Sequence, residues 1–313
     1  MEVIAQHKGE PIPAQIDITY KALYPILESR RADIERIKRK TFKYGATDRH
    51  QLDVYYPTAT PTGKAPVLFF VYGGGFASGE RQMPAPRDLV YTNVGAFFAK
   101  QGLATVIADY RILPNMKFPD PVIDIRDAIT WFDEHASEVN AGASVKADTD
   151  HIFVMGHSVG AAIVASVFLM PGVFPASLAP RVRGLILKGG AHHFQTKAPV
   201  PIPPTLLTAY YGTEAELLER QPLALLKAAP QEVVQRLPEV AVYVSEYEVP
   251  SIRESSTDFR QLLSERTGKP VYFGELAGHT HISPHVALGT GQGEDWAIEV
   301  ADWVKARVIK ASL

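Results

Sequence analysis

The stretch Gly156-His157-Ser158-Val159-Gly160 decides the fold of this chain. This G-x-S-x-G pentapeptide follows the apolar run His151–Met155 and precedes the small-residue run Ala161–Ala165. The first run predicts a buried strand, and the second predicts the start of a helix. A serine on the sharp turn between them is pushed out over the strand end, and the flanking glycines keep the turn free of Cβ clashes. The pattern therefore predicts that Ser158 is a nucleophile.

The composition is that of an ordinary globular protein. The chain has 313 residues, of which 46% are hydrophobic and 21% charged, and its formal net charge is −2. There is no basic excess that would indicate nucleic acid as a partner, and no apolar run approaches the roughly 18 residues of a membrane span. We therefore expect a small-molecule substrate, no nucleic acid and no membrane span. The sequence leaves a homodimer open.

Two further features bear on chemistry and location. The chain has no cysteine, which excludes disulfides, thiolate metal sites and a cysteine nucleophile. The segment Met1–Lys8 carries early charges and lacks the apolar core of a signal peptide, so we expect a cytoplasmic protein.

Continuous apolar runs recur from about residue 66 onwards. They are Val67–Tyr72, Leu103–Ala108, His151–Met155, Val182–Leu187, Val240–Val244 and Val271–Phe273. Runs that are apolar at every position are typical of strands covered on both faces, in a parallel sheet with crossover helices. We predict an α/β domain over residues 41–313. It is preceded by a helical segment over residues 1–40, in which Pro25 marks a break or a first turn.

Residues 195–238 interrupt this alternation. The proline-rich stretch Pro199–Pro204 is followed by a helical pattern around Glu214–Leu225. An insertion here would lie above the strand ends and cover Ser158. Two interpretations stay open, a lid over the serine or an ordinary surface excursion. The helical segment 1–40 is a candidate second part of such a lid.

A glycine-rich stretch, Val71–Phe76, follows a predicted buried strand. Three successive glycines let backbone N–H groups approach a ligand closely and point in one direction. A dinucleotide fingerprint does not fit, because after Gly73 and Gly75 the next glycine is Gly79, one residue too late for G-x-G-x-x-G. We therefore assign the N–H groups of Gly74 and Gly75 as oxyanion donors, with that of Val159 as the third.

A carboxylate that orients the catalytic base is expected at a strand end after the serine. The apolar run Val240–Val244 is followed by Glu246 and Glu248. We favour Glu248, which would face away from the core if the strand ends at Val244, and we keep Glu246 as the alternative.

Three histidines, His279, His281 and His285, fall within seven residues after the last apolar run. Such a cluster can hold a metal, but Glu275 is the only carboxylate near it in the sequence. A catalytic triad of serine, acid and histidine is already complete without a metal. We expect no metal. We favour His281 as the base, because the apolar Ile282 would anchor its loop, and His279 is the alternative.

Side chains next to these motifs are candidates for contacting substrate. They are Tyr72, Phe76, His157, His192 and Tyr211. A surface turn at His192 is an equally good interpretation, and His157 also fits packing against the sheet. The proline-, leucine- and tyrosine-rich lid indicates a small or medium apolar acyl group.

Together these motifs resemble the α/β-hydrolases of the hormone-sensitive-lipase-like carboxylesterase group, and kynurenine formamidases are similar. The resemblance extends over residues 40–310. It is carried by Tyr72–Phe76, Gly156–Gly160 and Gly278–Ser283, with further matches at Asp109–Arg111, Phe118-Pro119, Asp124 and Trp131. It implies an eight-stranded, mostly parallel sheet flanked by helices, a lid over the strand ends, and no cofactor.

Two positions depart from that family. Tyr72 stands where the family usually has a histidine that supports the oxyanion loop, so we expect a retained oxyanion hole with altered packing behind it. Glu248 stands where the acid is usually an aspartate, and this leaves the assignment of the acid open rather than the reaction class.

The sequence predicts a serine hydrolase of carboxylic esters. His281 would take the proton of Ser158, and Glu248 would orient the imidazole. If a hydroxyl of the substrate replaced water, the same site would transfer the acyl group or form a lactone. An amidase or formamidase on the same three residues is a further alternative, as is a non-catalytic ligand-binding module of this fold.

Overall fold

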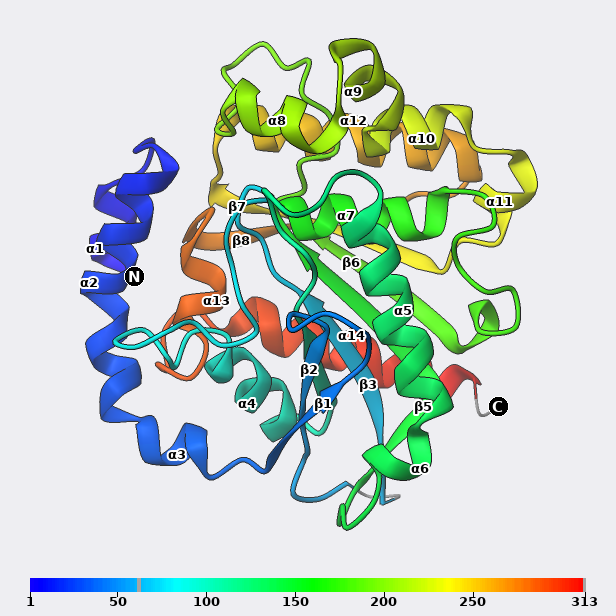
Figure 1. The fold of residues 1–313 in the computed structure, drawn as a ribbon. Coiled ribbons are helices and arrows are strands. Elements are labelled where there is room, and N and C mark those ends of the chain that lie inside the picture. The colour runs from blue at the N-terminus through cyan, green and yellow to red at the C-terminus, as the bar shows by residue number, and fades with distance from the viewer. Residues whose placement is uncertain (61–62, 312–313) are drawn as a thin grey trace.

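An eight-stranded sheet with strand order β1-β2-β4-β3-β5-β6-β7-β8 runs through the computed structural model, which describes residues 1–60 and 63–311 (Figure 1). The strands are β1 (Arg39–Lys43), β2 (Gln51–Tyr55), β3 (Lys64–Val71), β4 (Ala104–Ala108), β5 (Lys146–His157), β6 (Val182–Lys188), β7 (Glu239–Tyr247) and β8 (Tyr272–Thr280). β2 pairs antiparallel with β1 and β4, and the remaining pairs are parallel. The predicted eight-stranded, mostly parallel α/β fold is confirmed. Residues 312 and 313 of the predicted domain lie outside the described residues.

The central strands form where the sequence is apolar at every position. β4 is buried along its whole length, and Phe69 of β3 lies between Val106 of β4 and Val154 of β5. The edge strand β8 continues seven residues beyond the predicted apolar run that ended at Phe273, to Thr280. Its burial alternates because one face is exposed, so a search for continuous apolar runs finds only its beginning.

Helices cover both faces of the sheet (Figure 1). One face carries α5 (Asp120–Glu134), α7 (Val159–Leu169) and α12 (Pro250–Thr267), and α6 (Ala136–Val139) follows α5. The other face carries α4 (Thr92–Lys100) and α14 (Asp295–Ala311). These two helices meet through the rings of Phe98 and Trp296, whose centroids are 6.3 Å apart.

The N-terminal segment forms α1 (Glu2–Gln6), α2 (Ile12–Ser29) and α3 (Arg31–Glu35). Pro25 lies inside α2, and the helix continues past it, so the predicted break is wrong. Leu23 and Leu27 are buried, whereas Pro25 is on the exposed face of the helix. The carbonyl that a proline leaves without its N–H donor therefore faces water there, which makes the missing hydrogen bond tolerable. α2 packs against α13 (Ser283–Ala287), and α1 against β8.

The segment between β6 and β7 forms the predicted insertion. It contains α8 (Pro204–Tyr211), α9 (Glu214–Arg220), α10 (Pro222–Ala228) and α11 (Gln231–Gln235). α8, α9 and α10 lie at the top of Figure 1, and α11 lies at its right-hand side. α10 packs against α7 and α12. α9 begins with a capping box, in which the side chains of Thr213 and Glu216 each bond the other residue's backbone N–H. The insertion is thus a folded unit above the sheet.

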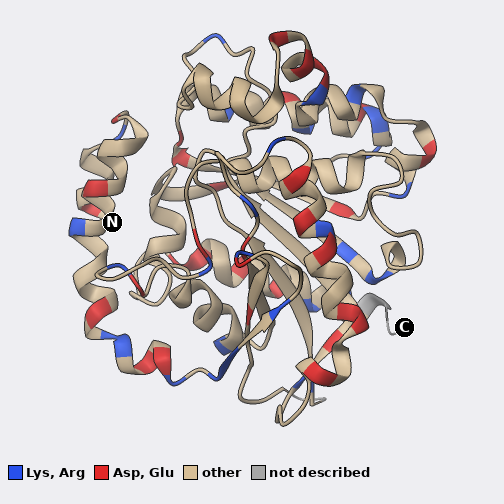
Figure 2. Ribbon diagram, in the orientation of Figure 1, with Lys and Arg blue, Asp and Glu red and all other residues tan. Residues whose placement is uncertain are grey.

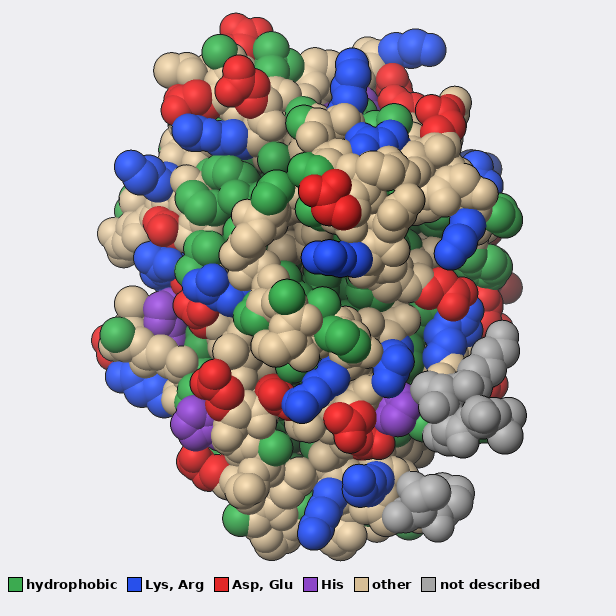
Figure 3. Space-filling view, turned by 90° about the vertical axis from the view of Figure 1, so that its right-hand side faces the viewer, with side chains coloured by type: hydrophobic (Ala, Val, Ile, Leu, Met, Phe, Trp, Pro, Cys, Tyr) green, Lys and Arg blue, Asp and Glu red, His purple; other side chains and the backbone are tan. Residues whose placement is uncertain are grey.

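Charges of both signs are spread over the outer helices and loops (Figure 2). The central strand β4 carries none. Figure 3 shows acidic and basic side chains mixed with hydrophobic ones on the face that is at the right of Figure 1. Among the described residues, no helix has the length and apolar character needed to cross a membrane.

Candidate active site

Ser158 occupies the turn between β5 and α7, with φ 56° and ψ −125°. A positive φ is strained for a residue with a side chain and persists only where the surroundings hold it. The Ser158 N–H donates to the carbonyl of Lys188 at 3.0 Å, and the Ser158 carbonyl accepts from the N–H of Ala161 at 3.0 Å. A Cβ at Gly160 would lie 2.2 Å from the carbonyl oxygen of Val71, so only glycine fits. The elbow therefore has the predicted strand–turn–helix form.

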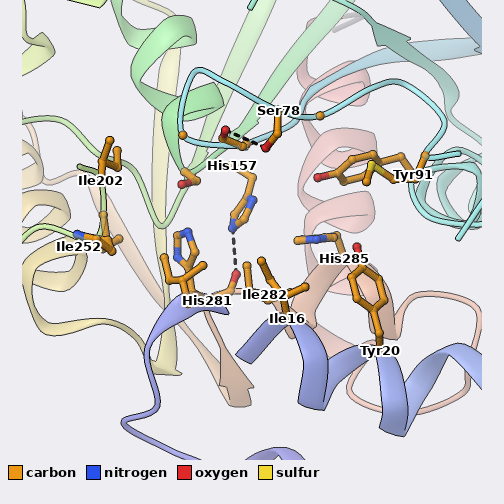
Figure 4. A pocket seen from close by; sticks show the side chains of 18 of the residues that line it. Ile16, Tyr20, Ser78, Tyr91, His157, Ile202, Ile252, His281, Ile282 and His285 are labelled. Carbon is orange, nitrogen blue, oxygen red and sulfur yellow. Dashed lines mark hydrogen bonds between the residues drawn. The ribbon is translucent and has the colours of Figure 1, made fainter. Parts of the chain in front are cut away.

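Ser158 lines a cavity of about 330 Å³ at the carboxyl ends of the strands (Figure 4). The walls come from parts of the chain that lie far apart in sequence. They include Ile12 and Ile16 of α2, Ile202 of the insertion and Ile252 of α12. Both segments proposed as a lid from the sequence thus contribute to the walls. The size suits a small organic molecule.

Glu248 and His281 form a buried pair next to this cavity. Nδ1 of His281 lies 2.7 Å from Oε1 of Glu248, and both side chains are almost completely buried. The carboxylate also accepts the backbone N–H of Val249 at 3.0 Å. Glu246 is exposed and instead accepts the N–H of Gly278 at 2.7 Å. Of the two predicted acids, the structure places Glu248 beside the histidine.

The backbone of His281 is held on both sides. Its N–H donates to Oε1 of Gln15 at 3.1 Å, and its carbonyl lies 2.9 Å from Nε2 of His157, which must carry the proton because a carbonyl only accepts. The alternative base, His279, is tied by Nδ1 to the hydroxyl of Ser283 at 2.9 Å and by Nε2 to a backbone carbonyl at 2.7 Å. Of the two candidates, His281 both contacts a carboxylate and lines the cavity.

The glycine loop lies against the serine. A Cβ at Gly73 would come 2.9 Å from Cβ of Ser158, and Gly74 and Gly75 have φ values of 132° and 61°. The carbonyl of Gly74 is bonded within its own loop, by the hydroxyl of Ser78 at 3.0 Å and the N–H of Ser78 at 3.0 Å. The N–H groups of Gly74, Gly75 and Val159 donate to no described residue. Donors left free beside a serine are suited to stabilising an oxyanion.

Two further histidines surround the pair. The ring of His157 is 4.6 Å from that of His281 and 4.9 Å from that of His285, measured between centroids. Burial, reinforced by the neighbouring His281, holds the pKa of His157 well below its usual range. Burial does the same for the pKa of His285. Both are therefore neutral at pH 7, which leaves no second imidazolium to compete for Glu248.

Tyr72, predicted to contact substrate, does not line the cavity. Its hydroxyl donates to Oδ1 of Asp109 at 2.7 Å and accepts from Arg49 at 2.9 Å. Its ring stacks on Tyr110, and a Cβ at Gly79 would come 2.6 Å from it. The side chain lies behind the glycine loop because its hydroxyl is drawn to the buried carboxylate. It lies against the glycine loop without reaching the ligand space.

Three other predicted contact residues also point elsewhere. The ring of Phe76 stacks on Tyr210 of α8 with centroids 4.0 Å apart, and Tyr211 stacks on Phe118 at 5.6 Å. These rings fasten the insertion to the body of the protein. His192 stacks on Phe259 of α12 at 4.1 Å. Of the five predicted contact residues, His157 alone lines the cavity.

Gly189 and the individual side chains of α2 were not predicted from the sequence. A Cβ at Gly189 would lie 2.9 Å from Oε2 of Glu248 and 3.2 Å from Nδ1 of His281, so glycine makes room for the pair. The available signal was Gly189-Gly190 directly after a predicted strand. No local signal marks Gln15, because its partner His281 is 266 residues away.

The BD-FAE family model matches residues 52–173. The chain is 26% identical over 256 residues to a probable isoprenylcysteine alpha-carbonyl methylesterase of Oryza sativa subsp. japonica, covering 76% of this chain and 56% of the relative. It is 23% identical over 248 residues to a kynurenine formamidase of Salmo salar, covering 77% of this chain and 73% of the relative. The chain spans 5%, 22% and 56% of the lengths of the first three curated relatives.

Among solved structures, the chain is similar to that of a fungal esterase from Rhizomucor miehei. The TM-score is 0.69 and the sequence identity 21%, with 99% of this chain and 97% of the other covered. At this identity the likeness concerns the fold.

Proposed function

From its α/β-hydrolase fold, we propose that this chain is a serine hydrolase that cleaves carboxylic esters through an acyl-enzyme. The observation that carries the proposal is the buried pair of His281 and Glu248, 2.7 Å apart. His281 lines the same cavity as Ser158, which lies on its strained turn. The names of relatives and of similar structures, a methylesterase and a fungal esterase, support ester substrates.

Each residue of the proposed site has its own role in the reaction. Because Nδ1 of His281 donates to Glu248, its Nε2 is the unprotonated nitrogen that takes the proton of Ser158. The serine oxygen attacks the carbonyl carbon, and the N–H groups of Gly74, Gly75 and Val159 bind the developing oxyanion. Each such donor contributes about 3–4 kcal/mol of transition-state stabilisation. His281 then protonates the leaving alcohol, and a water molecule activated by His281 releases the acid.

We propose that the insertion and the N-terminal helices together form the lid of this site. Ile202 from the insertion, and Ile12 and Ile16 from α2, supply apolar wall to the cavity. A covered, largely apolar site strengthens the electrostatic interactions that the mechanism needs.

Hydrolysis of amides or formamides is the second candidate, favoured by the match to a kynurenine formamidase over 77% of the chain. The same three residues would serve both reactions. Comparison of kcat/KM for 4-nitrophenyl butyrate and N-formylkynurenine separates them. Transfer of the acyl group to a substrate hydroxyl uses the same acyl-enzyme, and mass spectrometry of the product distinguishes it from hydrolysis.

Labelling with a fluorophosphonate tests the nucleophile. The native protein is expected to form one adduct, mapped by peptide mass spectrometry to Ser158. Ser158→Ala abolishes labelling, whereas Ser78→Ala, which removes the other serine of the cavity wall, is still labelled. A native protein that forms no adduct is a ligand-binding module rather than an enzyme, and the proposal then fails.

A further inference from the structure

The cavity has two chemically different ends (Figure 4). Ile202 and Ile252 lie at one end, and Tyr20, Tyr91 and His285 lie at the other, with His281 between them. The reacting centre is therefore flanked by an apolar end and by an end that carries hydroxyl and imidazole groups.

The second end holds polar groups without partners. The hydroxyls of Tyr20 and Tyr91, two residues of the cavity wall, make no hydrogen bond to any described residue. Nδ1 of His285 is buried without a partner in the same part of the chain. Tyr91 and His285 are both more than nine-tenths buried, and their ring centroids are 5.3 Å apart. Buried polar groups are nearly always hydrogen-bonded. Polar groups that line a cavity and have no partner in the protein can bond a ligand placed there.

A permanent positive charge belongs to this end. The guanidinium of Arg87 lies 4.2 Å from the centroid of the Tyr20 ring, and Arg87 lines the cavity. Its ion pair with Asp17 is 4.0 Å long, and because Arg87 is partly exposed and Asp17 largely exposed, solvent screens the interaction. Among the described residues that line the cavity, Arg87 is the only lysine, arginine, aspartate or glutamate. Since burial keeps His285 neutral by lowering its pKa, the charge of this end is that of Arg87.

The backbone at Tyr91 indicates a selected geometry. Its φ is 67°, one of three positive values at described residues other than glycine, and another is that of Ser158. A non-glycine residue in this conformation is strained, and such residues cluster at active sites and ligand-binding sites. At Tyr91 it places a buried ring in the cavity wall, directly before α4.

We propose that Tyr20, Arg87, Tyr91 and His285, called here the carboxylate end, bind a carboxylate group of the substrate. A carboxylate only accepts hydrogen bonds, at about four lone-pair positions, and this end offers guanidinium, phenol and imidazole donors. Arginine matches the planar carboxylate in both charge and geometry. The proposal rests on the proposed ester hydrolysis and names its substrate class, an ester that also carries a carboxylate. The apolar end takes the remaining hydrocarbon part.

Two pairs of esters test this. Monoethyl glutarate, with the carboxylate on the acyl side, is compared with its neutral isostere ethyl 5-methylhexanoate. The butanoate ester of 4-hydroxybenzoate, with the carboxylate on the alcohol side, is compared with 4-methylphenyl butanoate. In at least one of the two pairs, we expect kcat/KM for the charged ester to be at least about tenfold higher than for the neutral ester. This is the size of effect that a hydrogen bond to a charged group produces. This preference weakens at high ionic strength because Arg87 is partly exposed.

Arg87→Met removes the charge and retains much of the side-chain volume. It is expected to lower the ratio of kcat/KM for the charged ester to that for its neutral isostere by about tenfold, mainly through KM. Tyr91→Phe lowers the same ratio less, because it removes one neutral donor. Arg36→Met, at an exposed arginine of the N-terminal segment, leaves the ratio unchanged.

Two results would overturn the carboxylate end. They are a native protein that cleaves charged and neutral esters equally well in both pairs, and an Arg87→Met variant with an unchanged ratio. If Ser158 is still labelled by the fluorophosphonate in either case, only this inference fails. Loss of labelling and of all ester cleavage would instead overturn the proposed function.

Discussion

The backbone N–H of His281 donates a hydrogen bond to Oε1 of Gln15, 3.1 Å away. Gln15 is buried in α2, and its Nε2 donates to the carbonyl of Glu10 at 2.7 Å, which fixes the orientation of the amide. On its other side, the carbonyl of His281 is held by His157. The proposed base is thus positioned by side chains from the N-terminal helix and from the serine turn.

Gln15→Met is expected to lower kcat. It leaves the N–H of His281 buried without an acceptor, at a cost of about 1–3 kcal/mol, and frees the backbone that orients the imidazole. We expect about a tenfold loss in kcat and in the rate of fluorophosphonate labelling, because small misplacements of a catalytic group are costly. Lys21→Met, on the exposed face of the same helix, is the control. A lower melting temperature with kcat retained would show that Gln15 only stabilises the fold.

Glu248→Gln is expected to reduce kcat by about 10³–10⁴, because the neutral amide neither stabilises the imidazolium nor selects its tautomer. Glu246→Gln changes an exposed side chain that accepts the N–H of Gly278, and it is expected to alter kcat little. Both are measured with 4-nitrophenyl butyrate. The reverse order of effects would assign the acid to Glu246.

Gly189→Ala is expected to damage catalysis more than stability. The variant adds a Cβ 2.9 Å from Oε2 of Glu248 and 3.2 Å from Nδ1 of His281. Gly172→Ala is a matched control, because Gly172 also has a positive φ, of 74°, but no atom within 4 Å of a new Cβ. Both variants are expected to lose about 1 kcal/mol of unfolding free energy from backbone strain. Only Gly189→Ala should lose kcat, by roughly 100-fold; equal kcat in the two variants would refute the steric argument.

The parts of the site that local patterns encode could be predicted. Ser158 and Gly74 belong to short motifs whose backbone geometry is set by their own glycines. Glu248 was predicted on the assumption that the strand ends at Val244, but β7 continues to Tyr247. The predicted strand end is therefore wrong. Glu246 lies on the exposed side of this extension, and Glu248 is the residue beside His281.

Other parts depend on packing between distant segments. Gln15 and Tyr20 reach the site because α2 packs against α13. The spacing of hydrophobic residues in these two segments does not predict that they contact each other. A residue's position next to a motif in the sequence also does not tell where its side chain points. Tyr72 and His192 follow strand ends near the site, yet their neighbours Asp109 and Phe259 hold them outside the cavity.

Tyr72→Phe distinguishes support of the loop from contact with substrate. The variant leaves the ring stacked on Tyr110 but removes the hydroxyl bonded to Asp109 and Arg49, so we expect about 1–3 kcal/mol less unfolding free energy. KM should change little, because the ring does not line the cavity. Urea unfolding and steady-state kinetics measure the two effects, with Tyr272→Phe as an exposed control. A large rise in KM at unchanged stability would place Tyr72 in contact with substrate after all.

Lys188 makes stability depend on pH. It is buried at the end of β6, its Nζ has no hydrogen-bond partner among the described residues, and the amine lies 4.2 Å from the centroid of the Trp296 ring. Burial lowers the pKa of the amine from 10.5 to about 7, with the charge of Glu248 acting in the opposite direction. Below pH 7 the amine is protonated in both the folded and the unfolded chain, so the cost of the buried charge applies in full. Between pH 7 and about 10.5 the unfolded chain binds more protons, so this cost falls as pH rises.

Lys188→Met is therefore expected to stabilise the protein, and more strongly at pH 6 than at pH 9. The full shift corresponds to at most about 5 kcal/mol at pH 6, and about 2 kcal/mol would remain at pH 9. Unfolding free energies from urea titrations at the two pH values, for the native protein and the variant, measure the difference. Lys21→Met, at an exposed lysine, should give the same small change at both. An equal gain from Lys188→Met at pH 6 and pH 9 would mean that the buried amine does not titrate in this range, and that its charge is not what costs the fold stability.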